Sequence, residues 1–186
     1  MRKKNLVMGI MAAFFVAVSL MGNCQAARPN VSDTVGVEKF IEAFNRIASE
    51  DGIYRITNWK SGDVDEEYQD FVCFVSDKVS PPESIVLLPV AASDGYLNSI
   101  VLSMSPQTSY AGRAAAFIPV YIVRAFGNTD LRDTQKVTGC VNQFMARKKT
   151  CDVIWESSNG KVYRVFCDRA DDPRRSFIVG IYCPSE

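Results

Sequence analysis

The sequence contains no histidine. The side chains considered first for chemistry are therefore its cysteines and arginines. Without imidazole, the chain lacks the commonest general base, Ser-His-Asp and Cys-His catalysis, and imidazole metal sites. It also lacks a Gly-x-x-x-x-Gly-Lys phosphate loop, a Gly-x-Gly-x-x-Gly fingerprint and a Cys-x-x-Cys pair. These patterns favour a binding role over catalysis, and we expect neither a cofactor nor a metal ion.

Two of the six cysteines, Cys151 and Cys167, bound a predicted β-hairpin. Two runs of β-branched and aromatic residues flank Ser158-Asn159-Gly160, and an Asn-Gly pair in that setting is a strong hairpin signal. A two-residue loop, Asn159-Gly160, would place the two cysteines on opposite faces of the hairpin. A three-residue loop, with Gly160 left-handed and a bulge after it, would place them opposite each other on one face.

The three-residue loop is the preferred prediction because it gathers matching side chains on one face. It pairs Trp155 with Tyr163, Val153 with Val165 and Cys151 with Cys167, and cross-strand packing favours such pairs. A one-residue slip would scatter them. The register makes Cys151 and Cys167 disulfide candidates, although a directly hydrogen-bonded pair is not ideal geometry for a bridge. Two neighbouring buried thiols remain the alternative.

Arginines near the C-terminus could bind an anionic ligand, because a guanidinium group suits carboxylate and phosphate. The candidates are Arg164, Arg174 and Arg175. Three aspartates within residues 168–172 lie among them, so ion pairing within the chain competes with this role.

The densest carboxylate cluster lies in residues 63–67, within a segment (61–70) that we expect to be a polar loop. Asp63, Asp65 and Glu67 alternate as at the start of a calcium loop. An EF-hand loop counted from Asp63 would need glycine at Tyr68 and glutamate at Phe74, so the pattern fails twice. A solvated loop is the preferred interpretation.

Residues 1–26 are predicted to be a secretory signal peptide. A basic start, Arg2 to Lys4, precedes an uncharged, mostly apolar run from Leu6 to Met21, and Cys24-Gln25-Ala26 offers small residues before a cleavage point. The alternative is a lipid anchor at Cys24, as in bacterial lipoproteins, but Asn23 stands where that pattern has a small residue.

Cleavage after Ala26 would leave residues 27–186 as a single domain able to bury its own core. Removing three basic residues leaves 18 against 21 acidic ones, a net charge of −3. That balance argues against nucleic acid or an anionic membrane surface as partner. We expect no membrane span in this mature part. Five cysteines remain, and an oxidising compartment would keep disulfides between them.

The hydrophobic pattern predicts an α+β fold: an antiparallel sheet of about six or seven strands, with two or three helices packed on one face. Helices are expected at about 37–47 and from a cap at Thr129 or Asp130 to about Lys148. Strands are expected at 53–60, 71–75, 85–92 and 97–104, in the two arms of the hairpin, and at 175–183.

Two features of this pattern stay open. Residues 110–126 read either as one kinked helix containing Pro119 or as a short helix followed by an extended run. Pro89 suggests that its strand is an edge or carries a bulge. In addition, apolar residues in the two amphipathic helices align at a constant offset, so the chain could be a helix-then-strands pseudo-repeat.

From these features we expect an exported bacterial protein that binds an unknown protein or small-molecule ligand in the periplasm or outside the cell, without catalysis. One alternative is a small exported hydrolase that uses paired carboxylates, which would need two acids converging in a concave pocket. A lipid-anchored structural envelope protein is the other alternative.

Overall fold

The computed structural model describes residues 36–64, 67–76, 84–93, 95–104, 111–126, 130–147, 149–158, 160–169 and 177–182. Within these ranges the chain forms the helices α2 (Gly36–Ala48), α3 (Ala111–Ala125) and α4 (Leu131–Arg147). The strands are β1 (Arg55–Val64), β2 (Tyr68–Ser76), β3 (Ile85–Ala92), β4 (Leu97–Met104), β5 (Cys151–Glu156), β6 (Val162–Asp168) and β7 (Phe177–Tyr182). The predicted signal peptide lies outside the described residues.

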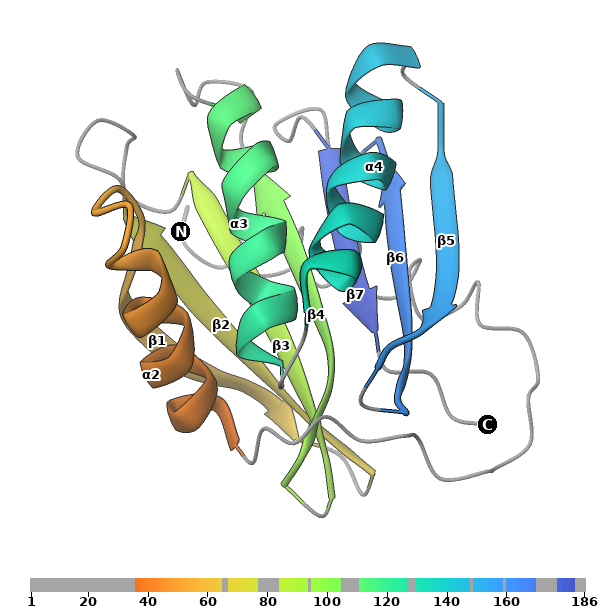
Figure 1. The fold of residues 1–186 in the computed structure, drawn as a ribbon. Helices are drawn as coiled ribbons and strands as arrows, with labels where there is room; N and C mark the ends of the chain where they lie inside the picture. Colours follow the sequence, from red (N-terminus) through yellow and green to blue (C-terminus); the bar gives the residue numbers. More distant parts are fainter. Residues whose placement is uncertain are drawn as a thin grey trace.

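The seven described strands form one antiparallel sheet in the order β1-β2-β3-β4-β7-β6-β5. The three helices lie side by side on one face of it (Figure 1). Helix α2 contacts β1 and β3, α3 contacts β4 and β7, and α4 contacts β5 and β6. This confirms the predicted α+β architecture. No helix in the described part of the chain is long and apolar enough to cross a membrane.

The helix predicted at 37–47 is α2, and its apolar stripe faces the core. Val37, Phe40 and Phe44 recur at steps of three and four residues, and all three are buried. Gly52 follows the helix with φ +65°, and its backbone N–H donates to the carbonyl of Ala48 at 3.0 Å. A glycine adopts this left-handed conformation without steric cost, which is why the helix ends there.

The segment around Pro119 is one helix, α3, with the proline inside it. This settles the choice that the sequence left open. The C-terminal half of α3 is fastened to the residues that follow α2: the hydroxyl of Tyr121 donates to Asp51, and Arg124 forms an ion pair with Glu50 at 3.2 Å. The contacts hold the two helices together above β3 and β4.

One local prediction was right in part and another was wrong. Pro89 lies in β3, which is an interior strand and not an edge, but the ladder to β4 shifts register between Val90 and Ala91, as the bulge alternative predicts. The pairing of β2 with β3 runs from Asp70–Val90 to Cys73–Leu87 without a pair between them. Because proline has no N–H to donate, the ladder is interrupted on that side, while Pro89 still pairs with Ile100 of β4. The polar segment 61–70 is mostly strand, because β1 extends to Val64 and β2 begins at Tyr68.

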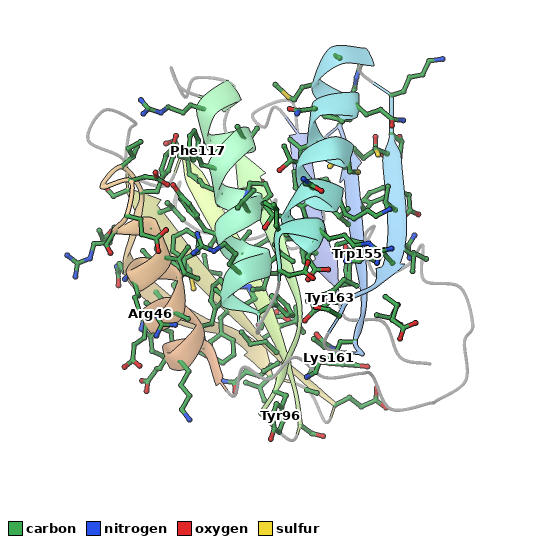
Figure 2. The ribbon with its side chains drawn as sticks, in the orientation of Figure 1. Arg46, Tyr96, Phe117, Trp155, Lys161 and Tyr163 are labelled. Carbon is green, nitrogen blue, oxygen red and sulfur yellow. The ribbon has the colours of Figure 1, made fainter. Side chains whose placement is uncertain are left out.

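The hairpin register is confirmed in full. Trp155 pairs with Tyr163, Val153 with Val165 and Cys151 with Cys167. Gly160 has φ +76°, as the three-residue loop requires. The Trp155 and Tyr163 rings stack at 5.7 Å, on the face that the helices cover (Figure 2).

The helix-then-strands arrangement is visible in the described chain, with α2 preceding β1–β4 and α4 preceding β5–β7. The sheet order places β1 and β5 at the two edges and β2 and β6 next to them. The first half contributes one strand more than the second, so the halves correspond only in part.

Candidate functional site

The start of α4 is built around two aspartates that cap it reciprocally. The carboxylate of Asp130 accepts from the backbone N–H groups of Arg132 and Asp133, at 2.8 and 3.1 Å. In return, Oδ2 of Asp133 accepts from the backbone N–H of Asp130 at 3.0 Å. The result is a capping box in which Asp133, three residues after the N-cap, takes the place of the usual Glu or Gln. It confirms Asp130 as the N-cap.

Asp133 also fastens the β5–β6 hairpin to this helix end. Its side chain is 0% exposed. Oδ1 accepts from Nε1 of Trp155 at 2.7 Å, and Oδ2 accepts from the Ser157 hydroxyl at 2.6 Å. A buried carboxylate is tolerated because these donors replace its water shell. The first turn of α4 is therefore held in a fixed position against the end of β5.

A pocket of about 510 Å³ lies beside this junction, between the first turns of α4 and the edge strand β5. We call it the β5-edge pocket. Its lining is Arg132, Lys136, Ile154, Trp155, Glu156, Ser157 and Ser158. Two cations one helical turn apart thus face the strand edge, and Glu156 supplies the single carboxylate of the lining.

Within the described ranges, no strand pairs with the outer side of β5. Ser157 donates its N–H to the carbonyl of Lys161 at 2.8 Å, so Ser157 is a hydrogen-bonded position of the hairpin. In an antiparallel pair these positions alternate, so Trp155 bonds to β6 whereas Ile154 and Glu156 direct their N–H and C=O groups toward the open edge. The Ile154 side chain is 61% exposed.

The N-terminal end of a helix carries a partial positive charge, which disfavours a cation in its first turn, where Arg132 lies; Lys136 lies beyond that turn. Arg132 and Lys136 are exposed at that end of α4, and within the described part of the chain neither forms a salt bridge. Asp130 and Asp133 offset part of this cost.

Of the three arginines selected from the sequence, the described chain includes Arg164. Arg164 forms a two-point ion pair with Asp152 across the hairpin, at 2.9 and 2.6 Å. That hydrogen bond raises the pKa of Arg164, and the guanidinium group is already satisfied. Arg174 and Arg175 lie outside the described residues.

The disulfide considered between Cys151 and Cys167 is absent, although the two residues are paired as predicted. All four described cysteines, Cys73, Cys140, Cys151 and Cys167, are buried free thiols. The sulfur of Cys167 contacts Cys140 of α4 at 3.7 Å. By the alternation described above, Cys151 and Cys167 are a hydrogen-bonded pair, with Cα atoms about 5.5 Å apart and side chains that stand side by side.

Sequence reasoning missed Arg132, Lys136 and Asp133. The prediction of this helix rested on its cap, its apolar face and its basic C-terminal end, and it singled out none of the three. Two signals could have helped: an Asp-x-x-Asp spacing at the helix start, which marks a capping box, and Arg132 in a first turn that disfavours cations.

Fold and site together define an α+β protein whose edge strand borders a basic pocket. No protein-family model matches the chain, and comparison with curated proteins and with solved structures finds no significant match for it.

Proposed function

We propose that this chain is an exported, non-catalytic binding protein that captures an extended, acidic peptide segment of a partner along the open edge of β5. The observation that supports this most is the β5-edge pocket, where two cations that form no salt bridge with any described residue flank a strand edge that no described strand covers. Export is part of the proposal and depends on residues 1–26.

The mode of binding follows from the backbone. A peptide added as an extra strand would satisfy the outward N–H and C=O groups of Ile154 and Glu156, which is the usual source of affinity in strand addition. β5 is short, and both Asp152 and Glu156 are charged, which are features that protect an edge against uncontrolled pairing. A specific partner therefore needs a further attraction.

Arg132 and Lys136 would supply that attraction. Guanidinium and ammonium groups at the pocket rim favour carboxylates at alternate positions of the incoming strand, because alternate side chains point to the same face. Ile154 offers apolar contact on the outer side of the same edge. The helix start that carries both cations is fixed by Asp133, so little ordering of the site would be needed on binding.

Carboxylate catalysis would need two acids facing one hollow, and the β5-edge pocket has Glu156 alone. This favours binding over the hydrolase alternative.

Fluorescence anisotropy with synthetic probes tests the proposal. The probe is a labelled seven-residue peptide that alternates glutamate with valine, and the control probe carries lysine in place of glutamate. We expect the acidic probe to bind at least tenfold more tightly than the basic one. Equal affinity for both probes would contradict the charge argument.

Variants locate the binding. Arg132→Glu with Lys136→Glu should weaken binding of the acidic probe by at least tenfold, whereas Lys39→Glu, an exposed charge change on α2 at the far end of the sheet, should leave it unchanged. Ile154→Pro removes an outward N–H without breaking the β5–β6 ladder, so it should weaken binding while the melting temperature stays close to wild type. A similar loss in the Lys39→Glu variant would indicate non-specific attraction.

The export proposal has its own test, which is the mass of the protein recovered from a bacterial host. Cleavage after Ala26 predicts a soluble chain that starts at residue 27. A diacylglycerol adduct on Cys24 would indicate the lipid-anchored alternative, and an intact residue 1–26 segment would contradict export.

A further inference from the structure

Three buried thiols meet beneath the C-terminal half of α4. Cys140 comes from α4, Cys151 from β5 and Cys167 from β6, and they are 2%, 4% and 0% exposed. Cys140 lies at the centre: its sulfur contacts that of Cys167 at 3.7 Å and lies 3.9 Å from the carbonyl of Val165. Cys73, in β2, belongs to the other half of the sheet.

The geometry separates the three pairings of this cluster. Cys151 and Cys167 are neighbours in a hydrogen-bonded ladder, so their side chains stand parallel and must lean together to bond. Cys140 approaches Cys167 from the facing layer, and the two sulfurs lie 3.7 Å apart across the helix–sheet interface. Bond formation has to shorten this separation to about 2.0 Å.

We propose that Cys140 and Cys167 form the disulfide of this protein, linking α4 to β6, and that Cys151 remains a free thiol beside it. The proposal rests on the proposed export only for where the bond forms in the cell, since an oxidising compartment preserves such bonds.

The reaction needs an oxidant of the small-disulfide class, such as oxidised glutathione. The thiolate of Cys140 attacks one glutathione sulfur, which forms a mixed disulfide and releases one glutathione thiol. The thiolate of Cys167 then displaces the second glutathione, and the protein disulfide forms. Two thiol protons and two electrons pass to the two reduced glutathione molecules, so the exchange balances.

Burial determines when this bond forms. The hydrogen bond to Cys167 and burial both raise the pKa of Cys140. The thiolate is the attacking form, so the folded protein holds less of it at neutral pH than an exposed cysteine would. We therefore expect the bridge to form quickly during folding and slowly in the folded, reduced protein.

Peptide mapping identifies the bridge directly, because trypsin separates the three thiols. Cys140 falls in the peptide 137–147, Cys151 in 150–161 and Cys167 in 165–169. The full chain is reduced, refolded with oxidised glutathione, alkylated, digested without reductant and analysed by mass spectrometry. We expect 137–147 joined to 165–169 as the dominant cross-link.

Variants and thermal melting complete the test. Cys151→Ser should keep the cross-link and the fall in melting temperature on reduction, and Cys73→Ala should do the same. Cys140→Ser should remove both. If that variant fails to fold, the peptide map of the wild-type and Cys151→Ser proteins decides alone.

A dominant 150–161 to 165–169 or 150–161 to 137–147 cross-link would overturn the assignment, as would only alkylated thiols after refolding. If the cross-link forms in vitro but the protein isolated from cells carries alkylated Cys140 and Cys167, the export proposal fails and the assignment of the bridge stands.

Discussion

Removing the carboxylate of Asp133 should be among the most damaging single changes in this chain. Asp133→Ala deletes the acceptor for the Trp155 indole N–H, the Ser157 hydroxyl and the backbone N–H of Asp130. Two of these donors belong to buried side chains, and water cannot reach the side chain that they face. The first turn of α4 and the end of β5 would lose the hydrogen bonds that connect them.

The magnitude follows from the number of donors left unpaired. A buried donor without an acceptor costs about 1–3 kcal/mol. Because the Ser157 hydroxyl can rotate, we take about 3–4 kcal/mol in total for Asp133→Ala, which corresponds to a fall of about 6–16 °C in melting temperature for a domain of this size. Asp133→Asn keeps Oδ1 as the acceptor for Trp155 but places an NH₂ group, which cannot accept a hydrogen bond, opposite the backbone N–H of Asp130. This variant should therefore lose about 1 kcal/mol of stability.

Urea unfolding followed by circular dichroism measures both variants, with Gln135→Ala, an exposed change on the same helix, as the control expected within about 0.5 kcal/mol of wild type. A double-mutant cycle with Trp155→Phe should give a coupling energy of about 1 kcal/mol or more. A cost below about 1 kcal/mol for Asp133→Ala, or equal costs for the alanine and asparagine variants, would refute this description of the junction.

Two further predictions concern packing and pH. A Cβ added to Gly180 would meet the Tyr182 ring at 2.5 Å, so Gly180→Ala should destabilise the protein by about 1–3 kcal/mol. A Cβ added to Gly139 would meet nothing within 4 Å, so Gly139→Ala should stabilise α4 by about 0.5–1 kcal/mol. Differential scanning calorimetry of the two variants measures both effects. The pKa of Asp130 lies below its ordinary 3.8, chiefly through the backbone hydrogen bond with Asp133. The ionised carboxylate of Asp130 therefore stabilises the fold fully above pH 3.8, and this stabilisation is lost as the pH falls through the lowered pKa of the folded state. In an acid titration, the Asp130→Asn variant should lose stability less steeply than wild type below about pH 4. The same dependence on acid pH in both proteins would contradict this.

The hairpin register was predictable because three matching pairs agree on one pairing. Stacked aromatic, β-branched and cysteine pairs all fall on one face when Gly160 takes a left-handed conformation, and a slip of one residue destroys all three. Helix α2 was predictable for a similar reason, since its period of three and four residues repeats without interruption.

The errors come from contacts between distant segments. The N–H of a strand residue points to one neighbouring strand, so a proline interrupts one ladder, and at Pro89 the interrupted ladder is that to β2 while the pairing with β4 continues. The pairing of Cys140 with Cys167 depends on how α4 lies across β6, which no local pattern encodes. The β5-edge pocket likewise exists only because Asp133 brings a helix start to a strand end.

Amide hydrogen exchange at the edge of β5 is the most direct test of the proposed binding. The amides of Ile154 and Glu156 should exchange rapidly in the free protein, because they face the open edge, and slow by at least tenfold when the alternating glutamate–valine peptide is added. The amide of Trp155, bonded to β6, should be slow in both states. Unchanged exchange at Ile154 and Glu156 in the presence of bound peptide would contradict strand addition at this edge.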